Sequence, residues 1–222
     1  MLAYYTMTIA KEGYIGLALA NAKARVSVPG VKAAITGTNP ISIAIPTKKD
    51  PIVLDMALSI VPIGKIVLAL RRGEKIPEGW ALNKNGEPTT DPVEAFQGYL
   101  LPIGRYKGLA LAIIIDILCS VFIGAPYGLK IHGKGAYTQG GFIVAALKPN
   151  IFRNYYEVLE ELEEFITAVK SLPKSANVEI MMPGEPEMRC YKKRLEKGIP
   201  IEEEVWEKVL KFASELGVGV EV

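Results

Sequence analysis

Apolar residues recur along this chain with two different periods, and the change between them divides it into elements. Spacings of three and four residues indicate helices, whereas short apolar runs and alternation with period two indicate strands. The predicted helices span 1–12, 56–72, 108–124, 154–171, 185–197 and 202–216, and the predicted strands span 14–20, 41–46, 52–54 and 142–147. Because strands and helices mix without regular alternation, we expect an α+β fold with a mixed-sheet core and flanking helices.

Glycine, proline and asparagine interrupt this pattern in three stretches, 21–40, 73–105 and 124–139, which we expect to be loops. Beyond residue 150 the apolar spacing is largely helical. We therefore expect two parts, a central α+β domain over residues 1–150 and a C-terminal helical region over residues 151–222 that packs on it.

The apolar stretch "GLALAIIIDILCSVFIG", residues 108–124, has the composition of a membrane span but only 17 residues. It carries Asp116 at its centre, where a charge is costly in lipid. These features favour a buried core helix over a membrane-associated protein, which stays the alternative. In a core helix, Asp116 should be paired within the protein or face a polar cavity.

Composition narrows the function classes. The chain has 222 residues with 26 basic and 24 acidic side chains, a net charge of +2 and no basic face with interleaved aromatics, which argues against a nucleic-acid binder. Its only cysteines, Cys119 and Cys190, lie far apart and make neither a disulfide framework nor a metal motif, which suits the cytoplasm. Lysine and glutamate are frequent and glutamine occurs only twice, a bias typical of thermophiles.

The common motifs for nucleotides and acyl transfer are absent from the sequence: no GxGxxG, no GxxxxGK[ST] and no GxSxG occurs. The only histidine, His132, lies in a predicted loop, where a solvated side chain is the ordinary interpretation. One histidine cannot form a histidine-rich metal site, and we predict no metal site.

Two charged residues stand at positions where chemistry is possible. Asp55 lies in the apolar run "PIVLDMALS", and a buried carboxylate needs a partner or a function. The alternative is that Asp55 caps the helix predicted over 56–72. Lys107 precedes the apolar helix, where main-chain donors could help it receive an anion; the alternative is a solvated lysine.

Several longer motifs follow one another along the chain: "EGYIGLALAN", "GTNPISIAIPT", "VLDMALSIVPIGKI", "EGWALNKNGEPTTDP", "LLPIGRYKGLALAIIIDILCSVFIGAP", "PGEPE" and "GIPIEEEVW". Together they resemble the malate/L-lactate dehydrogenases of the second type, the malate/L-sulfolactate/ureidoglycolate dehydrogenase family, over nearly the whole chain. The resemblance implies an NAD(P)-dependent oxidoreductase acting on a 2-hydroxy acid or its 2-keto acid. It also implies a fold that is L-sulfolactate-dehydrogenase-like and not Rossmann, and a homodimer with cofactor and substrate near the subunit interface.

By motif, the resemblance also assigns site residues. The cofactor, NAD or NADP, is expected at Leu54, Asp55, Met56, Ala57, Leu58, Ser59, Ile60, Tyr106, Lys107, Gly184, Glu185 and Pro186. The substrate, a malate, lactate or sulfolactate type of acid, is expected at Thr38 and Asn39. In the family, the aspartate of the "DMA" motif orients a catalytic histidine, a role that falls to Asp55.

The family's histidines lie upstream of the residues that match Met1, one of them in a "His-Phe-Gly" segment directly ahead of "MLAYYTM". We therefore expect this chain to be the C-terminal portion of a longer enzyme and inactive by itself. An internal start, a shortened relative and a fragment are all open, as is a non-catalytic module that binds nucleotide or dimerises. Ala22 and Gly141 depart from the family pattern, which often has serine and histidine there.

Overall fold

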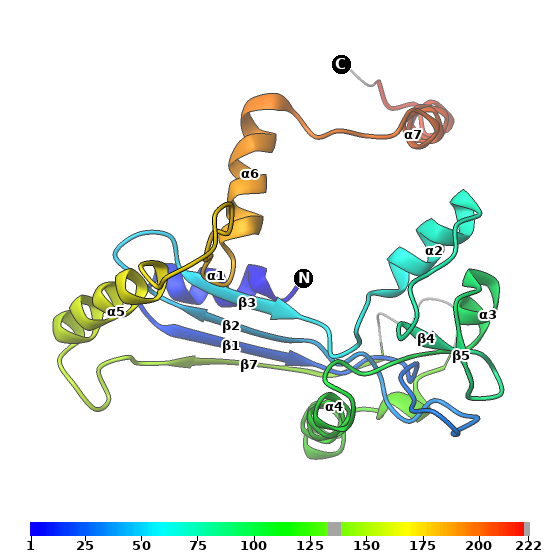
Figure 1. Ribbon diagram of the computed structural model, residues 1–222, viewed down its shortest axis with the longest axis horizontal. Helices are drawn as coiled ribbons and strands as arrows, with labels where there is room; N and C mark the ends of the chain where they lie inside the picture. The colour runs from blue at the N-terminus through cyan, green and yellow to red at the C-terminus, as the bar shows by residue number, and fades with distance from the viewer. Residues whose placement is uncertain (133–138, 220–222) are drawn as a thin grey trace. The chain divides into compact units, whose positions relative to one another are not determined.

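The computed structural model describes residues 1–132 and 139–219, which form two compact units, 1–184 and 185–222 (Figure 1). The helices of the first unit are α1 (Ala3–Lys11), α2 (Ile63–Arg72), α3 (Pro92–Gln97), α4 (Tyr106–Leu118) and α5 (Tyr155–Lys170), with short 3-10 turns η1 (Val121–Ile123) and η2 (Gly128–Lys130). Its strands are β1 (Ile15–Ala20), β2 (Ile41–Ile45), β3 (Ile52–Met56), β4 (Ala81–Leu82), β5 (Pro88–Thr89), β6 (Tyr99–Leu100) and β7 (Phe142–Leu147).

The larger sheet has the strand order β3-β2-β1-β7, and every neighbouring pair is antiparallel. Helix α1 lies on one face of it, where β1 and β2 present the small residues Gly16, Ala18, Ser42 and Ala44 (Figure 1). Because these side chains are small, the helix approaches closely, and the hydroxyls of Thr6 and Ser42 form a buried hydrogen bond of 2.8 Å. The start of α1 therefore has a defined position over the sheet.

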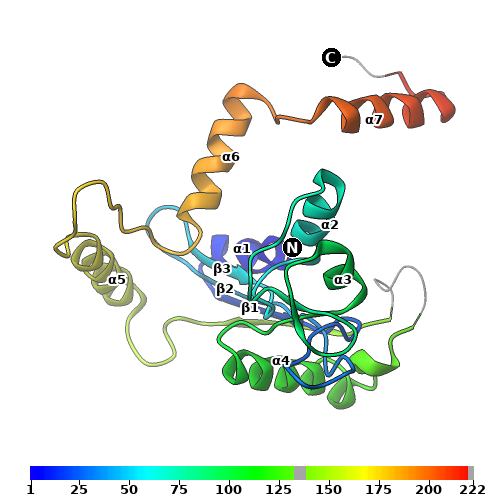
Figure 2. The same cartoon turned by 45° about the vertical axis from the view of Figure 1, so that its right-hand side comes forward.

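Helix α4 covers part of the opposite face (Figures 1 and 2). Its buried side, with Ala112 and Ile115, packs with Cys119 against Leu19 and Leu58. Half-buried apolar residues from all four strands surround this cluster: Leu17, Ile41, Met56 and Ile143. A sheet with helices on both faces confirms the α+β prediction, whereas its strand pairs are all antiparallel and not mixed as expected.

A second, three-stranded sheet has the order β5-β4-β6 and is also antiparallel. With α2 and α3 it encloses a separate apolar cluster: Val26, Val61, Ile66, Ala69, Ile76, Ala81, Ala95 and Leu100. Helix α3 begins at Pro92, and the Asp91 carboxylate caps it by accepting the Val93 N–H at 2.7 Å. The three strands and α3 fall in 73–105, which was predicted to be loop-rich; the prediction missed them because strands of two residues show no period.

The predicted helix over 56–72 was also wrong in its first part. β3 extends through Asp55 and Met56, which pair with Ser42 and Ile41, and α2 begins only at Ile63, directly after Pro62. Proline fits the start of a helix and not its interior, so it marks the boundary. The helix predicted over 108–124 ends at Leu118, and the 3-10 turn η1 follows it. The other long elements match their predicted spans to within two residues.

The second unit contains α6 (Glu185–Lys197) and α7 (Glu203–Glu215), neither of which has a buried residue. α5 belongs to the first unit, where the Tyr155 hydroxyl lies beside Gly13 in the turn between α1 and β1. The predicted division at residue 150 falls within the first unit, and the packing of a C-terminal helical region stays a prediction.

Candidate functional site

Three loops that are distant in the sequence meet beside the end of the larger sheet where β2 begins and β3 ends. Backbone hydrogen bonds join them: Leu58 N–H donates to Thr38 C=O at 2.7 Å, and Ile103 N–H donates to Leu58 C=O at 2.8 Å. Ile60 N–H adds a third bond, to Leu101 C=O at 2.9 Å. The structure thus brings together the predicted substrate loop, the "DMALS" segment and the approach to α4.

Asp55 lies in the edge strand β3 with an exposed side chain. Its Oδ2 accepts the backbone N–H of Ala3 at 3.0 Å, in the first turn of α1, where Leu2 at the N-cap position provides no side-chain bond. The positive end of the helix dipole favours a carboxylate there. The expectation of burial was therefore wrong, and so was the alternative that Asp55 caps the next helix, because α2 begins eight residues later.

The residues after β3 differ in exposure. Leu58 is 0% exposed and Ser59 is buried, with the Ser59 hydroxyl donating to Val61 C=O at 2.9 Å, whereas Ile60 is exposed. Leu54 is exposed on the strand, and Met56 and Ala57 are half-buried. Of the predicted cofactor residues in this segment, Leu54, Asp55 and Ile60 therefore present the most accessible side chains.

Tyr106 and Lys107 form the first turn of α4, and both side chains are exposed. The backbone reaches this turn through two residues with positive φ, Gly104 at 58° and Arg105 at 57°. No side chain caps the helix, although Lys107 N–H donates to Gly104 C=O at 3.3 Å, and the Lys107 side chain lies at the positive helix end. A Cβ on Gly108 would lie 1.9 Å from Ile103 C=O, so this position requires glycine.

Gly184 lies beside the outer edge of β3, where Val53 N–H donates to Pro183 C=O at 2.9 Å. Its φ of 90° and its closeness to Val53 both favour glycine. Glu185 and Pro186 are the first residues of α6 and belong to the second unit.

Thr38 and Asn39 are neighbours in the loop before β2 but have different surroundings. Asn39 is 0% exposed; its Nδ2 donates to Thr36 Oγ1 and to Ala112 C=O, each at 2.8 Å, and its Oδ1 accepts Ala22 N–H at 3.0 Å. Thr38 is half-buried, and its hydroxyl makes no hydrogen bond within the described residues. The substrate role of the two residues stays a prediction, and Thr38 has the available polar group.

Asp116 is 7% exposed and accepts three hydrogen bonds. Its Oδ1 receives Asn21 Nδ2 and Gly128 N–H, each at 3.0 Å, and its Oδ2 receives the Thr36 hydroxyl at 2.7 Å. The prediction that Asp116 is paired within the protein is confirmed. Sequence reasoning missed the partners because they come from segments up to 95 residues away.

The window Tyr106–Ile123, with a mean hydropathy of 2.1, is long and apolar enough to cross a membrane by length and composition, and a third of it is buried. Packing against the sheet and the bonded carboxylate are properties of a core helix.

Burial raises the pKa of the Cys119 thiol, and the Asp116 charge raises it further, whereas a hydrogen bond with the Ile143 backbone lowers it. No group of three metal-ligating side chains occurs within the ranges that the structure describes.

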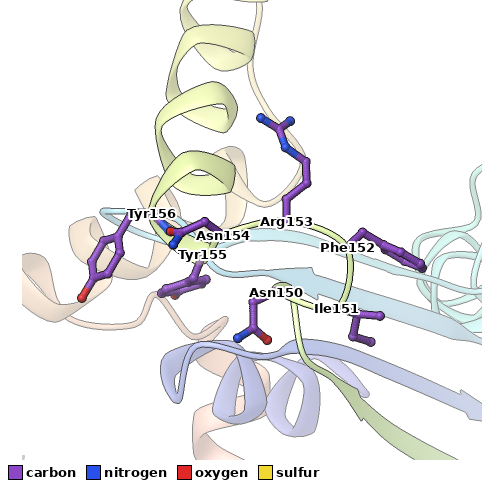
Figure 3. Close-up of a pocket in the computed structure, with 7 residues that line it drawn as sticks. All are labelled: Asn150, Ile151, Phe152, Arg153, Asn154, Tyr155 and Tyr156. Atoms are coloured by element: carbon purple, nitrogen blue, oxygen red, sulfur yellow. The ribbon is translucent and has the colours of Figure 1, made fainter.

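An open hollow of about 590 Å³ lies elsewhere, at the start of α5. It is lined by Asn150, Ile151, Phe152, Arg153, Asn154, Tyr155 and Tyr156 (Figure 3). Figure 3 shows these side chains spread along the loop instead of converging on one point. None of the predicted site residues lines it, so the candidate site remains the meeting point of the three loops.

Comparison with known proteins gives a consistent result. The family model described as malate/L-lactate dehydrogenase matches residues 1–210. The malate/(S)-sulfolactate dehydrogenase of Methanothermus fervidus is 37% identical over 218 residues, which are 97% of this chain and 63% of that protein. The L-sulfolactate dehydrogenase of Methanocaldococcus jannaschii is 35% identical over 222 residues, 98% of this chain and 64% of that protein.

Solved structures agree. The sulfolactate dehydrogenase from Methanocaldococcus jannaschii superimposes with a TM-score of 0.84 at 35% identity, covering 98% of this chain and 63% of that one. The malate dehydrogenase from Pyrococcus horikoshii OT3 gives a TM-score of 0.84 at 32% identity, covering 100% and 63%. The expected fold type is confirmed, and the chain spans less than two thirds of the length of these proteins.

Proposed function

Since the chain belongs to the malate/L-lactate dehydrogenase family, we propose that it forms the cofactor-binding part of an NAD(P)-dependent oxidoreductase. The reaction would interconvert a 2-hydroxy acid of the malate, lactate or sulfolactate type and its 2-keto acid. The observation that carries this proposal is the position of Asp55, whose carboxylate stands at the first turn of α1. The resemblance places a catalytic histidine directly ahead of that turn.

Asp55 has the properties that this role requires. One oxygen is held by Ala3 N–H, and the exposed carboxylate has room to accept a second bond. Accepting an imidazole N–H would select one tautomer and stabilise the protonated ring. The histidine could then take the hydroxyl proton of the substrate as hydride leaves the carbon, or return it in the reverse direction. In this proposal the histidine comes from a segment outside the 222 residues.

The residues at the start of α4 fit an anionic cofactor, because uncapped helix amides and the Lys107 ammonium both attract phosphate. When bound, the nicotinamide ring accepts or donates hydride. We assign Lys107, Tyr106 and the segment 54–60 to its binding, with Gly184 at the edge of β3 and Glu185 and Pro186 following it. One relative is named as NADP-dependent and another as NAD-dependent, so the proposal includes either cofactor.

Thr38 is the proposed substrate contact in the loop before β2. Its hydroxyl is the polar group there without a hydrogen bond in the described part of the chain, whereas the Asn39 side chain is occupied. The acids named for relatives, malate and sulfolactate, share a 2-hydroxy carboxylate and differ in the second acidic group. A hydroxyl donor fits the shared part.

The proposal includes a homodimer that works in the cytoplasm. The outward side of α4 and η1 carries Leu111, Ile114, Ile117, Val121 and Phe122, all exposed, with Phe122 at 79%. Apolar patches of this kind mark interaction surfaces. Family membership supports a second copy of this chain as the partner. The cytoplasm is the proposed location because it contains nicotinamide cofactors and small acids.

A two-part experiment tests the function. The 222-residue chain is titrated with NADH and NADPH by fluorescence, and its turnover of malate, lactate and sulfolactate is measured. The same assays are then run on a fusion with the segment that precedes the matched region in the Methanocaldococcus jannaschii enzyme. We expect cofactor binding by both proteins and turnover by the fusion only.

Two results would count against the proposal. Turnover by the chain alone would contradict the assignment of the acid/base group to an outside segment. Cofactor binding without turnover in the fusion would favour the second candidate, a nucleotide-binding or dimerisation module without catalysis, which the exposed apolar face of α4 also suits.

A further inference from the structure

Asp116 holds three segments that are far apart in the sequence. The donors to its carboxylate are Asn21 after β1, Thr36 before β2, and Gly128 after α4. All three are neutral, so the stability of the buried charge depends on these bonds. The segments they anchor surround the end of the larger sheet where the candidate site lies.

The charge on Asp116 sets the direction of the next hydrogen bonds. A carboxylate can only accept, so the Thr36 hydroxyl donates its single proton to Oδ2. The Thr36 oxygen is then left as the acceptor for Asn39 Nδ2 at 2.8 Å. The second Nδ2 proton goes to Ala112 C=O, and Asn39 Oδ1 receives Ala22 N–H. The Asn39 amide orientation that Ala22 N–H and Ala112 C=O require is thus the one that the bond from Thr36 to the carboxylate supports.

Asn39 has a φ of 30°, which is unusual for a residue other than glycine, and these bonds hold it there. The loop is tight as well: a Cβ on Gly37 would lie 2.2 Å from Ala22 C=O. Between Gly37 and Asn39, the Thr38 carbonyl points to the amide of Leu58 at 2.7 Å. The position of this carbonyl thus depends on the close backbone packing at Gly37 and on the side-chain hydrogen bonds of Asn39.

From Leu58 the connection continues to the start of α4. Leu58 C=O accepts Ile103 N–H at 2.8 Å, and residues 103–105 lead directly into the turn with Lys107. A change at Thr36 would therefore reach both segments that are assigned to the cofactor.

We propose that Asp116 is a positioning residue, whose charge acts through Thr36 and Asn39 to hold the Thr38 carbonyl and the 57–60 segment for cofactor binding. The link from Asp116 to Leu58 stands on the hydrogen bonds alone, whereas its effect on the cofactor rests on the proposed function. In this scheme Asp116, Thr36 and Asn39 do not touch the reacting atoms.

The test uses the full chain and three variants. Thr36→Val keeps the shape but removes the hydroxyl, Thr36→Ser restores it, and Asp116→Asn removes the charge. The control is Thr89→Val, the same change at a buried threonine in the smaller sheet, where the Thr89 hydroxyl donates to Glu94 Oε2 at 2.6 Å. Amide hydrogen exchange of Leu58 is measured against the amides of β1, together with the NADH dissociation constant.

We expect Thr36→Val to speed Leu58 exchange about tenfold more than β1 exchange and to raise the NADH dissociation constant about tenfold, as for loss of one hydrogen bond to a charged group. Thr36→Ser should restore both values, Asp116→Asn should shift both in the same direction as Thr36→Val, and Thr89→Val should change neither selectively. Unchanged relative exchange of Leu58 in Thr36→Val would overturn the inference. If the wild-type chain bound no NADH, the proposed function would fail, and Leu58 exchange alone would decide the link.

Discussion

The backbone N–H of Ala3 donates to the Asp55 carboxylate at 3.0 Å, joining the first turn of α1 to the edge strand of the larger sheet. Fifty-two residues separate these partners in the sequence. The bond gives Asp55 two separable roles, as the cap of α1 and as the proposed orienter of a histidine.

The capping role predicts different effects for two substitutions. Asp55→Ala removes the acceptor and should lower the free energy of unfolding by about 0.5–2 kcal/mol. Asp55→Asn keeps an oxygen acceptor and should change it little, since asparagine is also a good N-cap. Urea unfolding of both variants checks this. Equal losses in the two variants would show that charge, and not the hydrogen bond, stabilises the helix start.

Lys107→Ala should raise the apparent dissociation constant of NADH, because an exposed cation near phosphate or ribose contributes mainly to binding. Lys84→Ala, in the exposed turn between β4 and β5, is the matched control and should leave binding unchanged. Fluorescence titration at two salt concentrations measures the effect. A Lys107 effect that does not weaken with salt would contradict an electrostatic role.

Substituting alanine for two glycines, Gly16 and Gly64, should change the stability of the protein in opposite directions. A Cβ on Gly16 would lie 2.6 Å from Thr6 C=O, so Gly16→Ala should push α1 off the sheet and destabilise the protein by about 1–3 kcal/mol. Gly64 in α2 has open space around it, so Gly64→Ala should stabilise by about 0.4–1 kcal/mol. Thermal unfolding of the two variants measures the sign of each change in stability. A Gly16→Ala protein as stable as wild type would contradict the close packing of α1.

Because the pKa of the buried Cys119 thiol is raised, we expect the protein to lose stability at alkaline pH. The thiol pKa is raised in the folded protein by burial, so the folded state keeps the thiol proton at a pH where the unfolded state has released it. The contribution is fully present below the ordinary thiol pKa of about 8.5 and is lost as pH rises above it. Comparing melting temperatures from pH 7 to 10 should show a smaller decline in Cys119→Ala than in wild type. Cys190→Ala, at an exposed position, should follow wild type.

The apolar face of α4 predicts the oligomeric state. Ile114→Glu places a charge on the exposed side of the helix and should shift a dimer toward monomer, whereas Lys84→Glu should not. Light scattering at micromolar concentration checks both variants. A wild-type chain that is monomeric under these conditions would contradict the homodimer proposal.

Much of the fold follows from local sequence, but the site does so only in part. The 142–147 strand and the 185–197 helix have the predicted bounds, because an apolar run marks the strand and helical spacing marks the helix. The two-residue strands of the smaller sheet carry none, and only tertiary pairing defines them. Pro62 offered a boundary signal for α2 that the apolar run after Asp55 obscured.

Side-chain roles depended on partners that the sequence does not reveal. The apolar neighbours of Asp55 suggested burial, yet its place on an edge strand exposes it. Asn39 was grouped with Thr38 by motif, and only the contact with Ala112, 73 residues away, separates a core amide from an available hydroxyl. For Asp116 the apolar helix predicted that a partner exists, but not that Thr36 would be one.

The central claim is that Asp55 orients a catalytic histidine, and the pH dependence of kcat in the fusion protein, with and without Asp55→Asn, tests it most directly. Loss of the carboxylate should lower the histidine pKa, because the protonated ring loses its partner. We predict that Asp55→Asn keeps the melting temperature and loses far more turnover than NADH affinity, with a shifted pH profile. Unchanged turnover and an unchanged profile in a folded Asp55→Asn protein would contradict the claim.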